Sequence, residues 1–415
     1  MQVYLVGGAV RDRLLGLPVG ERDWVVVGAR PEELEKLGYR SVGREFPVFL
    51  HPQTQEEYAL ARLERKVAPG YRGFTTQFSP DVTLEDDLKR RDLTINAIAQ
   101  TEAGEIIDPH GGRADLEARA LRHVSEAFVE DPVRILRVAR FAARFAHFGF
   151  KVVDETRALM KRMVESGEVD ALVPERVWQE TETALGEKNP EVYFEVLRDC
   201  GALAVIFPEL SALYGVPQPP RWHPEIDTGV HTMMALQCAT QLSDSTRVRF
   251  AAVMHDLGKA RTPQEKWPSH HGHEELGVSL IQALVARLKV PNDYRDLAVL
   301  VARYHGNIHR AKELRATTVL KVLEETDAFR RPERFAEMLI ACEADARGRT
   351  GLEKNPYRQR EFFMRALQAA SAVVLSTEER EGLIGPAIGE KFRRKRLTAV
   401  EAVCDARDEF FAAGV

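Results

Sequence analysis

The sequence predicts an α+β fold for the first 125 residues and an all-helical fold for the rest of the chain. Up to about residue 125, short runs rich in β-branched and aromatic residues alternate with short helical stretches. From Asp131 onward such runs nearly vanish, and amphipathic segments of 10–15 residues follow one another. At roughly one domain per 150 residues, a chain of 415 residues is long enough for two to four domains.

Five strands and two helices are expected in the first part. The strands are Val3–Val6, Trp24–Val27, Val48–His51, Tyr58–Ala61 and Glu105–Asp108, and the helices are Ala9–Leu15 and Leu84–Arg90. The second part is expected to begin with the helices Pro132–His147, Glu155–Glu165, Pro174–Leu185 and Pro190–Cys200. Prolines at positions 217, 219 and 220 then interrupt the helical pattern before a histidine-rich region. We therefore expect four regions, 1–125, 126–220, 221–350 and 351–415.

The composition is that of an ordinary soluble protein, with 44% hydrophobic and 29% charged residues and a net charge of -5. The cysteines at positions 200, 238, 342 and 404 form no CxxC pair, which predicts free thiols in a reducing, cytoplasmic compartment. No segment has 18 uncharged apolar residues, so we expect neither secretion nor a membrane partner. A nucleic-acid partner stays open, because phosphate contacts depend on local basic clusters rather than on the total charge.

The first functional motif is a strand that ends at Gly7-Gly8 and leads into a helix. Because glycine has no Cβ atom, this turn lets backbone N–H groups approach an anion closely, and Gly8 is the expected contact. Arg11, in the first turn of the helix, is expected to reach the same phosphates. A plain tight turn is the alternative explanation of the two glycines.

A pair of acidic residues follows at the start of the next strand, in Glu21-Arg22-Asp23. Alternate side chains of a strand share a face, so Glu21 and Asp23 are expected to point the same way and Arg22 the opposite way. Two neighbouring carboxylates repel each other, and Mg²⁺ ions bound to a triphosphate would compensate that repulsion. The alternative is a charged edge strand that faces solvent.

Together, the segments 7–12 and 21–24 resemble the signature of polymerase-β-type nucleotidyltransferases, and specifically of the bacterial tRNA nucleotidyltransferases that add CCA. Arg90–Ala97 resembles the RRD motif of that family, and Glu130–Arg134 resembles its EDxxR motif. The resemblance continues through Pro174-Glu175-Arg176 and covers nearly the whole chain, as in the long, multifunctional bacterial form. One departure is Glu21, where the family usually has Asp.

The resemblance implies a polymerase-β-like palm, a helical neck and body, and addition of C, C and A from CTP and ATP to the 3′ end of tRNA. It implies Mg²⁺ ligation by Glu21 and Asp23, with Glu57 as a third acid, and triphosphate binding by Arg91. Asp131 and Arg134 would select the base. Cytosine and adenine both present an amino donor beside an unprotonated ring nitrogen, which an Asp acceptor and an Arg donor complement.

A stripe of arginines continues along the same predicted helix, at positions 134, 137, 140 and 144. The resemblance assigns Arg137 and Arg140 to the triphosphate and leaves Arg144 undecided. A solvated face of a packed helix is the alternative for such a stripe.

A second motif lies in the histidine-rich region, where His255-Asp256 stands inside the apolar run Phe250–Leu257. A buried His-Asp pair needs polar partners, and one metal ion would supply them. The pattern resembles the HD phosphohydrolase superfamily, which implies metal ligation by His231, His255, Asp256 and Asp345. It further suggests Lys259 for a substrate phosphate and His273 and His305 as accessory histidines, with His270, His271 and His309 more doubtful.

Ni, Mn, Zn or Fe would suit imidazole and carboxylate ligands, and Ni²⁺ is the metal we name for this site. Within the long bacterial CCA-adding group, the resemblance implies 2′,3′-cyclic phosphodiesterase, 2′-nucleotidase and phosphatase activities. The alternatives are a poly(A) polymerase of the same family and a non-catalytic RNA-binding protein.

The basic run Lys391–Arg396 is either an RNA contact or an exposed helix face. The oligomeric state stays open between a monomer and a homo-oligomer.

Overall fold

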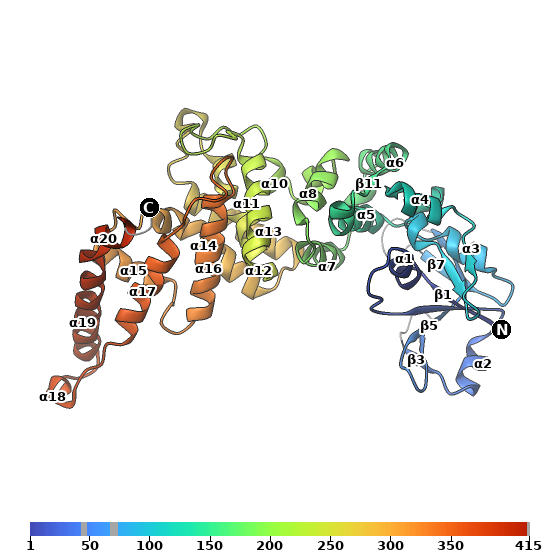
Figure 1. The fold of residues 1–415 in the computed structure, drawn as a ribbon, viewed down its shortest axis with the longest axis horizontal. Coiled ribbons are helices and arrows are strands. Elements are labelled where there is room, and N and C mark those ends of the chain that lie inside the picture. The colour runs from blue at the N-terminus through green and yellow to red at the C-terminus, as the bar shows by residue number, and fades with distance from the viewer. Residues whose placement is uncertain (43–47, 67–73, 413–415) are drawn as a thin grey trace. The chain divides into compact units, whose positions relative to one another are not determined.

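The computed structural model describes residues 1–42, 48–66 and 74–412. The chain forms two compact units, Met1–Ile206 and Phe207–Val415. The first unit combines a mixed sheet with helices, and the second is helical, so the predicted α+β class followed by helices is confirmed (Figure 1).

A seven-stranded sheet forms the centre of the N-terminal part of the first unit, in the order β3-β4-β5-β2-β1-β8-β9. Its strands are β1 (Gln2–Val6), β2 (Asp23–Val27), β3 (Arg40–Val42), β4 (Val48–Leu50), β5 (Glu57–Leu60), β8 (Ala99–Thr101) and β9 (Ile106–Ile107). Strand β2 is antiparallel to β1 and parallel to β5, so it is an interior strand rather than a charged edge strand.

Both faces of the sheet are packed, and alternation along β2 assigns its residues to them. Val25 belongs to a buried cluster with Val6 and Leu88, whereas Val26 belongs to another with Leu34 and Phe49. Helix α3 (Leu84–Lys89) therefore covers one face, and α2 (Pro31–Lys36) covers the other. Short helices α1 (Gly8–Leu14) and α4 (Gly112–Ala118) complete this part of the unit.

Four further strands have no counterpart among the expected ones, in addition to β3 and β8. They are β6 (Arg62–Lys66) and β7 (Phe74–Phe78), which pair with each other, and β10 (Ala120–Leu121) and β11 (Lys151–Val152), which also pair. The strands of two or three residues are too short to show a period of two. Strand β6 reads RLERK and lacks the β-branched residues by which the other strands are recognised. The expectation of helices alone after Asp131 is wrong at β11.

The helical part of the first unit is built around α5 (Val133–Phe145). It packs against α7 (Pro174–Leu185) and α8 (Pro190–Asp199), while α6 (Asp154–Glu165) and α9 (Ala202–Ile206) complete the layer. The apolar residues of α5 at positions 135, 138, 142 and 145 are all buried, as expected from their helical spacing. The arginine stripe of this helix therefore runs beside its packed face.

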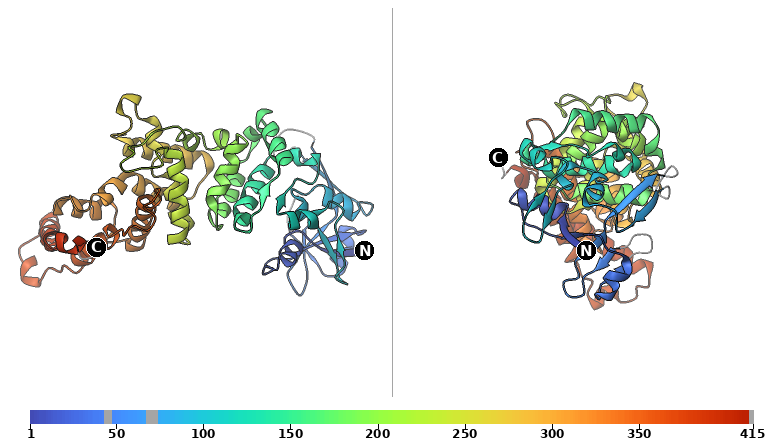
Figure 2. Two further views of the ribbon diagram at one scale, coloured as in Figure 1. Left: turned by 45° about the horizontal axis from the view of Figure 1, so that its top comes forward. Right: turned by 90° about the vertical axis from the view of Figure 1, so that its right-hand side faces the viewer.

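The second unit is a helical bundle, coloured from light green through yellow to red in Figure 2. Its principal helices are α11 (Thr228–Leu242), α12 (Thr246–Met254), α13 (His273–Leu288), α14 (Asn292–His309) and α16 (Pro332–Arg347). They are followed or accompanied by α10 (Pro208–Ser211), α15 (Ala316–Glu325), α17 (Gln359–Ser371), α18 (Thr377–Arg380), α19 (Pro386–Asp405) and α20 (Arg407–Ala412). Helices α11 and α12 pack on α16, and α12 and α13 pack on α14.

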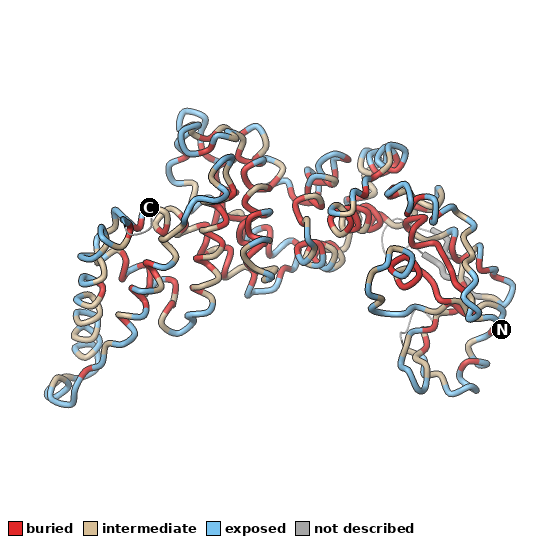
Figure 3. The backbone as a smooth tube through the Cα atoms, viewed as in Figure 1, coloured by how far each residue is buried: buried red, intermediate tan, exposed pale blue. Residues whose placement is uncertain are grey.

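Buried residues, shown in red in Figure 3, lie in the central strands of the sheet and along the packed sides of the helices. All four cysteines are free, as predicted, and Cys200, Cys238 and Cys342 are buried. Burial raises the pKa of the Cys200 and Cys238 thiols to about 11, so these side chains stay protonated. Among the described residues, no helix has the length and apolar character needed to cross a bilayer.

Candidate functional sites

The first candidate site lies where β2 and β5 begin. Their parallel register places Asp23 opposite Glu57, and the next pair, Trp24 and Tyr58, stacks its rings at 5.5 Å between centroids. Directly opposed residues point to the same face of a sheet, so the two carboxylates lie on the face that carries Val25 and α3. Both carboxylates are exposed.

Glu21 lies in the loop two residues before β2 rather than within the strand. Partial burial raises the pKa of Asp23, the positive charge of Arg91 opposes that rise, and the negative charge of Glu21 adds to it. Glu21 is thus close enough for its charge to act on Asp23. Arg22 instead forms an ion pair with Glu56 at 3.5 Å. Glu21, Glu57 and Arg91 therefore lie around Asp23 at the start of β2.

The glycine turn is brought beside these acids because β1 pairs with β2. Val6 is the register partner of Asp23, and Gly7 follows directly with φ of 68°. A Cβ atom at Gly7 would lie 3.0 Å from Nη1 of Arg91. The first glycine is therefore required both by its backbone conformation and by the close approach of a guanidinium group. A Cβ atom at Gly8 would lie 3.4 Å from Nη2 of Arg11.

Arg91 follows α3, and its guanidinium group is held by two hydrogen bonds. Its Nη2 donates to Oδ2 of Asp87 at 3.3 Å, and its Nη1 donates to the carbonyl oxygen of Asn96 at 3.4 Å. Its side chain is 19% exposed, so it keeps access to the solvent above the glycine turn. Arg91 thus lies close to Gly7, and its charge acts on Asp23.

A connected series of polar side chains extends from α1 into the helical part of the unit. Arg11 is buried, and its Nε and Nη1 donate to Oδ1 of Asp12 at 2.8 Å and to Oδ1 of Asn96 at 2.6 Å. The second oxygen of Asp12 accepts from Arg144 at 3.0 Å. Asn96 in turn donates to Oδ1 of Asp92 at 2.9 Å.

The series continues through two arginines of α5. Nε of Arg137 donates to Oδ2 of Asp92 at 2.7 Å, and its Nη1 lies 3.8 Å from Glu180. Nε of Arg140 donates to Oε2 of Glu180 at 2.6 Å. We call this set the polar chain, consisting of residues 11, 12, 92, 96, 137, 140, 144 and 180. The predicted triphosphate arginines are therefore each held by an acid, and sequence reasoning gave none of these acids a role.

The predicted base-selecting pair lies at the start of α5. Asp131 accepts from the backbone N–H of Val133 at 3.1 Å, as an N-terminal cap does. Its two oxygens also accept from Nη1 and Nη2 of Arg176 at 3.2 and 2.8 Å. Arg134 is buried, and its Nη1 donates to the carbonyl oxygen of Ala127 at 2.6 Å. The guanidinium group that binds both oxygens of Asp131 thus belongs to Arg176 of α7. Arg176 stands in the motif Pro174-Glu175-Arg176 noted in the sequence, which gave it no role.

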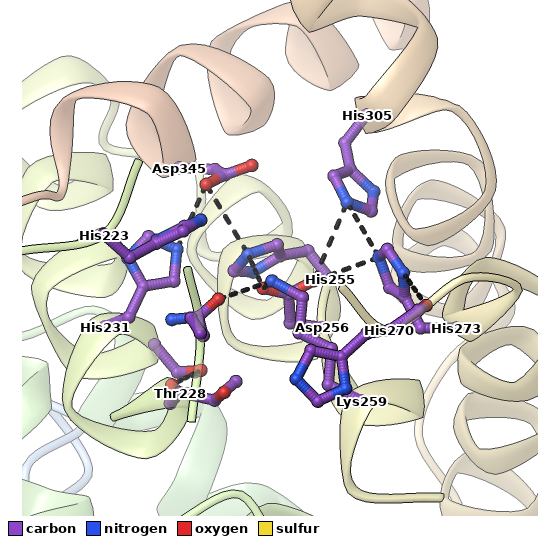
Figure 4. Close-up of polar contacts among 12 residues, drawn as sticks. His223, Thr228, His231, His255, Asp256, Lys259, His270, His273, His305 and Asp345 are labelled. Carbon is purple, nitrogen blue, oxygen red and sulfur yellow. Dashed lines mark hydrogen bonds and ion pairs between the residues drawn. The ribbon is translucent and has the colours of Figure 1, made fainter. Parts of the chain in front are cut away.

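The second candidate site lies in the helical unit and brings the predicted HD residues together (Figure 4). Nε2 of His231, from α11, lies 3.1 Å from Oδ1 of Asp345 on α16. Nε2 of His255, directly after α12, lies 3.7 Å from the same oxygen. These three residues offer ligand atoms that all lie within 4.8 Å of one another.

A second group adjoins it and includes the HD aspartate. Oδ1 of Asp256 lies 3.3 Å from Nε2 of His273 on α13 and 3.7 Å from Nε2 of His305 on α14. Burial lowers the pKa of His305 to about 3, so its ring is neutral near pH 7. The accessory histidines therefore meet the HD pair in space, although they come from separate helices.

The donor atoms of this region fit a divalent cation. Nδ1 of His255 lies 2.7 Å from the carbonyl oxygen of Ala252, and Nδ1 of His305 lies 3.0 Å from that of Val301. A carbonyl can only accept, so both Nδ1 atoms carry the proton and both Nε2 atoms turn a lone pair into the site. Nε2 of His255 lies 3.0 Å from Oδ2 of Asp256, and neither this Nε2 nor Oδ1 of Asp256 has a partner in hydrogen-bond geometry in the described parts of the chain. A bound cation would satisfy these two atoms.

Further residues complete the site, and the sequence had not indicated Glu225 and Arg349 among them. Oε1 of Glu225 lies 3.0 Å from Nδ1 of His231 and orients that ring. His309, held doubtful from the sequence, lies 2.5 Å from Oδ2 of Asp345. Arg349 donates to the other oxygen of Asp345 at 2.9 Å. A Cβ atom at Gly258 would lie 1.9 Å from the carbonyl oxygen of His273, so the HD turn packs directly on the start of α13.

The other two doubtful histidines lie outside these groups. His270 is buried, with Nδ1 2.7 Å from the Thr262 hydroxyl and Nε2 2.8 Å from the Pro217 carbonyl. His271 is exposed.

The basic run Lys391–Arg396 lies on α19 and is largely engaged within its own unit. Arg393 pairs with Glu324 at 3.0 Å, and Lys395 pairs with Glu379 at 2.8 Å. Arg396 stacks over Phe329 with 3.8 Å to the ring centroid. Arg393, Lys395 and Arg396 are therefore paired within the protein, which leaves fewer cations of this run for contact with a nucleic acid.

Three family models match the chain. The Poly A polymerase head domain matches residues 3–122, the probable RNA and SrmB-binding site of polymerase A matches 149–213, and the HD domain matches 228–346.

Three proteins of similar sequence match nearly the whole chain. The Multifunctional CCA protein of Thioalkalivibrio sulfidiphilus is 66% identical over 97% of this chain and 98% of its own length. That of Nitrosococcus oceani is 61% identical over the same shares, and that of Vibrio cholerae is 57% identical over 97% and 100%.

Solved structures with the same fold include a CCA-adding enzyme in an apo form, with a TM-score of 0.67 and 20% identity over 99% of this chain and 92% of that chain. A Thermotoga maritima CCA-adding enzyme complexed with tRNA has a TM-score of 0.61 and 20% identity, covering 99% and 91%. The Bacillus stearothermophilus CCA-adding enzyme in complex with CTP has a TM-score of 0.62 and 22% identity, covering 100% and 95%.

Proposed function

Since the chain belongs to the family of multifunctional CCA proteins, we propose that it adds C, C and A to tRNA 3′ ends and hydrolyses phosphoesters at its HD site. The observation that carries the first activity is the register of Asp23 with Glu57 beside the Gly7-Gly8 turn. CTP, ATP and tRNA are its substrates, and both activities depend on divalent metal ions.

In nucleotide addition, Glu21, Asp23 and Glu57 would hold Mg²⁺, which neutralises charge on the triphosphate when bound. Gly7 and Gly8 let the triphosphate lie against the backbone, where side chains would exclude it. Arg91 donates to phosphate oxygens above this turn, and Arg11, Arg137 and Arg140 support it from the polar chain. The tRNA 3′-hydroxyl is directed at the α-phosphate by binding to the helical part of the unit.

Base selection rests on hydrogen-bond polarity at the start of α5. Asp131 accepts from the exocyclic amino group that cytosine and adenine share, and Arg134 donates to the neighbouring ring nitrogen. Uracil and guanine present the opposite polarity and would leave these groups unpaired, which makes rejection strong. Arg176 holds the Asp131 carboxylate in place through its two hydrogen bonds.

In the HD site, His231, His255, Asp256 and Asp345 would hold a transition metal, for which we propose Ni²⁺, with His273 and His305 beside Asp256. The metal supplies Lewis-acid activation for phosphoester hydrolysis when bound. Lys259 donates to the substrate phosphate. The substrates we propose are 2′,3′-cyclic phosphates, 2′-phosphates and phosphomonoesters at RNA ends.

We assign the palm to residues 1–125, base selection and tRNA contact to 126–220, hydrolysis to 221–350 and a helical tail to 351–415. The unit boundary after Ile206 falls within the second of these regions. Free, mostly buried thiols support a cytoplasmic location.

Incubation of the protein with tRNA that lacks its 3′-terminal CCA, Mg²⁺ and single nucleotides tests the transferase activity. CTP alone should add two cytidines, and ATP should then add one adenosine. Poly(A) synthesis is the second candidate, since the matched head domain is named for it. Extension by many adenosines without any cytidine would establish that activity and overturn CCA addition.

A further inference from the structure

Gln218 is a buried residue of the proline-rich segment that precedes α11. Its backbone N–H donates to the carbonyl oxygen of Ile226 at 2.7 Å, and its neighbour Pro217 forms a bridge with Asp227. The segment thus folds back along the start of α11, which carries His231. The residue is only 1% exposed, so its amide must find its partners inside the protein.

One end of this amide is fixed by Lys259. Nζ of Lys259 donates to Oε1 of Gln218 at 2.5 Å and to Oδ2 of Asp256 at 2.6 Å. An ammonium group has donors only, so the oxygen of the amide must face Lys259 and the nitrogen must face away from it. The orientation of Gln218 therefore follows from chemistry rather than from a choice between two similar atoms.

The other end of the amide is unpaired. Nε2 of Gln218 is buried and has no hydrogen-bond partner in the described parts of the chain. Lys259, with two of its three N–H groups used on Gln218 and Asp256, retains one further donor. A cationic donor and a neutral donor thus stand side by side, next to the carboxylate of the HD pair.

This arrangement complements the oxygens of a phosphate group. Asp256 Oδ1, which faces His273 and His305, belongs to the same carboxylate that Lys259 contacts through Oδ2. A phosphate bound to the two free donors would therefore lie beside the atoms that fit a cation. Phosphate oxygens are strong acceptors and satisfy donors that the protein leaves unpaired.

We propose that Gln218 is a substrate-binding residue of the HD site, where its Nε2–H and the remaining N–H of Lys259 bind oxygens of a 2′,3′-cyclic phosphate or a phosphomonoester. This inference rests on the proposed hydrolase function and adds a residue to it. Gln218 lies 41 positions before Lys259 in the chain and outside the matched HD region, which begins at residue 228.

Gln218→Glu separates this role from a structural one. The variant keeps the length of the side chain and an oxygen for Lys259, so a residue that only anchors Lys259 tolerates it. It replaces the free donor by an oxygen that repels phosphate. Gln218→Met removes the donor without adding charge, but it also removes the oxygen that accepts from Lys259, so its result is interpreted only together with that of Gln218→Glu.

The test measures binding of inorganic phosphate by calorimetry, and KM for a 2′,3′-cyclic nucleotide, with the full-length, Ni²⁺-loaded protein. We expect both variants to weaken phosphate binding and raise KM by roughly tenfold to a hundredfold, as for one hydrogen bond to a charged group. Bound metal per chain and CCA addition should equal those of the parent protein.

An unchanged phosphate affinity in either variant would overturn the inference. A parent protein that binds phosphate but hydrolyses no phosphoester would overturn the proposed hydrolase function instead. In that case, a loss of phosphate binding in both variants would still support Gln218 as an anion-binding residue.

Discussion

Asp23 and Glu57 lie directly opposite each other on the parallel strands β2 and β5, although 33 residues separate them in the sequence. The next residues of the two strands, Trp24 and Tyr58, stack on each other, which fixes the register. Glu56, one position away, belongs to the alternate set of side chains and binds Arg22 and the indole of Trp24. A shift of one residue would exchange Glu57 for Glu56 at the site.

Asp23→Ala should therefore reduce nucleotide addition by at least about a hundredfold, because it removes a metal ligand rather than a supporting group. Glu57→Gln should give a smaller loss of the same kind. Glu56→Gln, on the alternate side, should leave the rate near that of the parent. Single-turnover CMP incorporation measures the effect, and HD hydrolysis should be unchanged in all three. Normal incorporation by Asp23→Ala would contradict the assignment.

Gly7→Ala should lower both stability and nucleotide affinity. The residue has φ of 68° and ψ of -129°, a conformation that costs an L-residue about 1–3 kcal/mol. Its Cβ atom would also displace Arg91, which lies 3.0 Å away. Gly20→Ala is the control, since a Cβ atom there meets nothing within 4 Å. Chemical denaturation and KM for CTP report the two effects, and equal results for the two variants would count against this role of Gly7.

Arg176→Lys should relax base selection. A lysine keeps the charge but cannot hold both oxygens of Asp131, so the carboxylate loses one hydrogen bond of its fork. We expect the ratio of kcat/KM for CTP over UTP to fall by about tenfold, corresponding to one hydrogen bond between charged groups. Arg157→Lys, on the exposed side of α6, should not change the ratio. A ratio that stays constant in Arg176→Lys would show that Asp131 needs no such support.

Asp92 should make the first unit sensitive to acid. Burial alone would raise the pKa of Asp92, but the charge of Arg137 and hydrogen bonds from Asn96, Arg137 and the Leu93 backbone hold it well below its usual range. Because the folded pKa is the lower one, this stabilisation is complete above the unfolded pKa of about 3.9 and is lost progressively as the pH falls below it.

Asp92→Asn should remove this dependence and cost about 1–3 kcal/mol at pH 7, because Arg137, which is 37% exposed and also lies near Glu180, loses its charged partner. Hydrogen exchange of the α5 amides, compared between pH 7 and pH 4, measures the change. If exchange in the variant matched that of the parent at pH 7, the ion pair would contribute nothing to stability.

His255→Ala should abolish hydrolysis and the binding of the HD metal while preserving CCA addition. Its Nε2 is a buried atom of this site without a hydrogen-bond partner in the described residues, so its loss would leave the cation with one ligand fewer. His271→Ala, an exposed histidine of the same region, is the control. Elemental analysis of the purified variants gives metal per chain, and full occupancy in His255→Ala would exclude this histidine as a ligand.

Local patterns in the sequence predicted the α+β class, the main helices and the interior strand Trp24–Val27, because burial of one face of a helix or strand imposes a period on its side chains. The pairing of Glu57 with Asp23 depends on strand order, which no local pattern contains. Asp12 and Asp92 stand inside the motifs noted in the sequence but received no role, and Glu180 was not noted, because each resembles an ordinary helix or turn residue until Arg144, Arg137 and Arg140 contact them. The contacts of Glu225 with His231 and of Gln218 with Lys259 likewise could not be predicted, because they form only when a loop folds back onto the start of α11.

The polar chain has a practical consequence for dissecting this protein. Asp12, Asn96 and Asp92 come from the palm, whereas their partners Arg144 and Arg137 come from α5, beyond the expected boundary at residue 125. A fragment that ends at that boundary would leave Asp12 and Asp92 without their arginine partners. We therefore expect the palm alone to be unstable. Chimeras that exchange palms between relatives should therefore carry α5 and α7 along with the sheet.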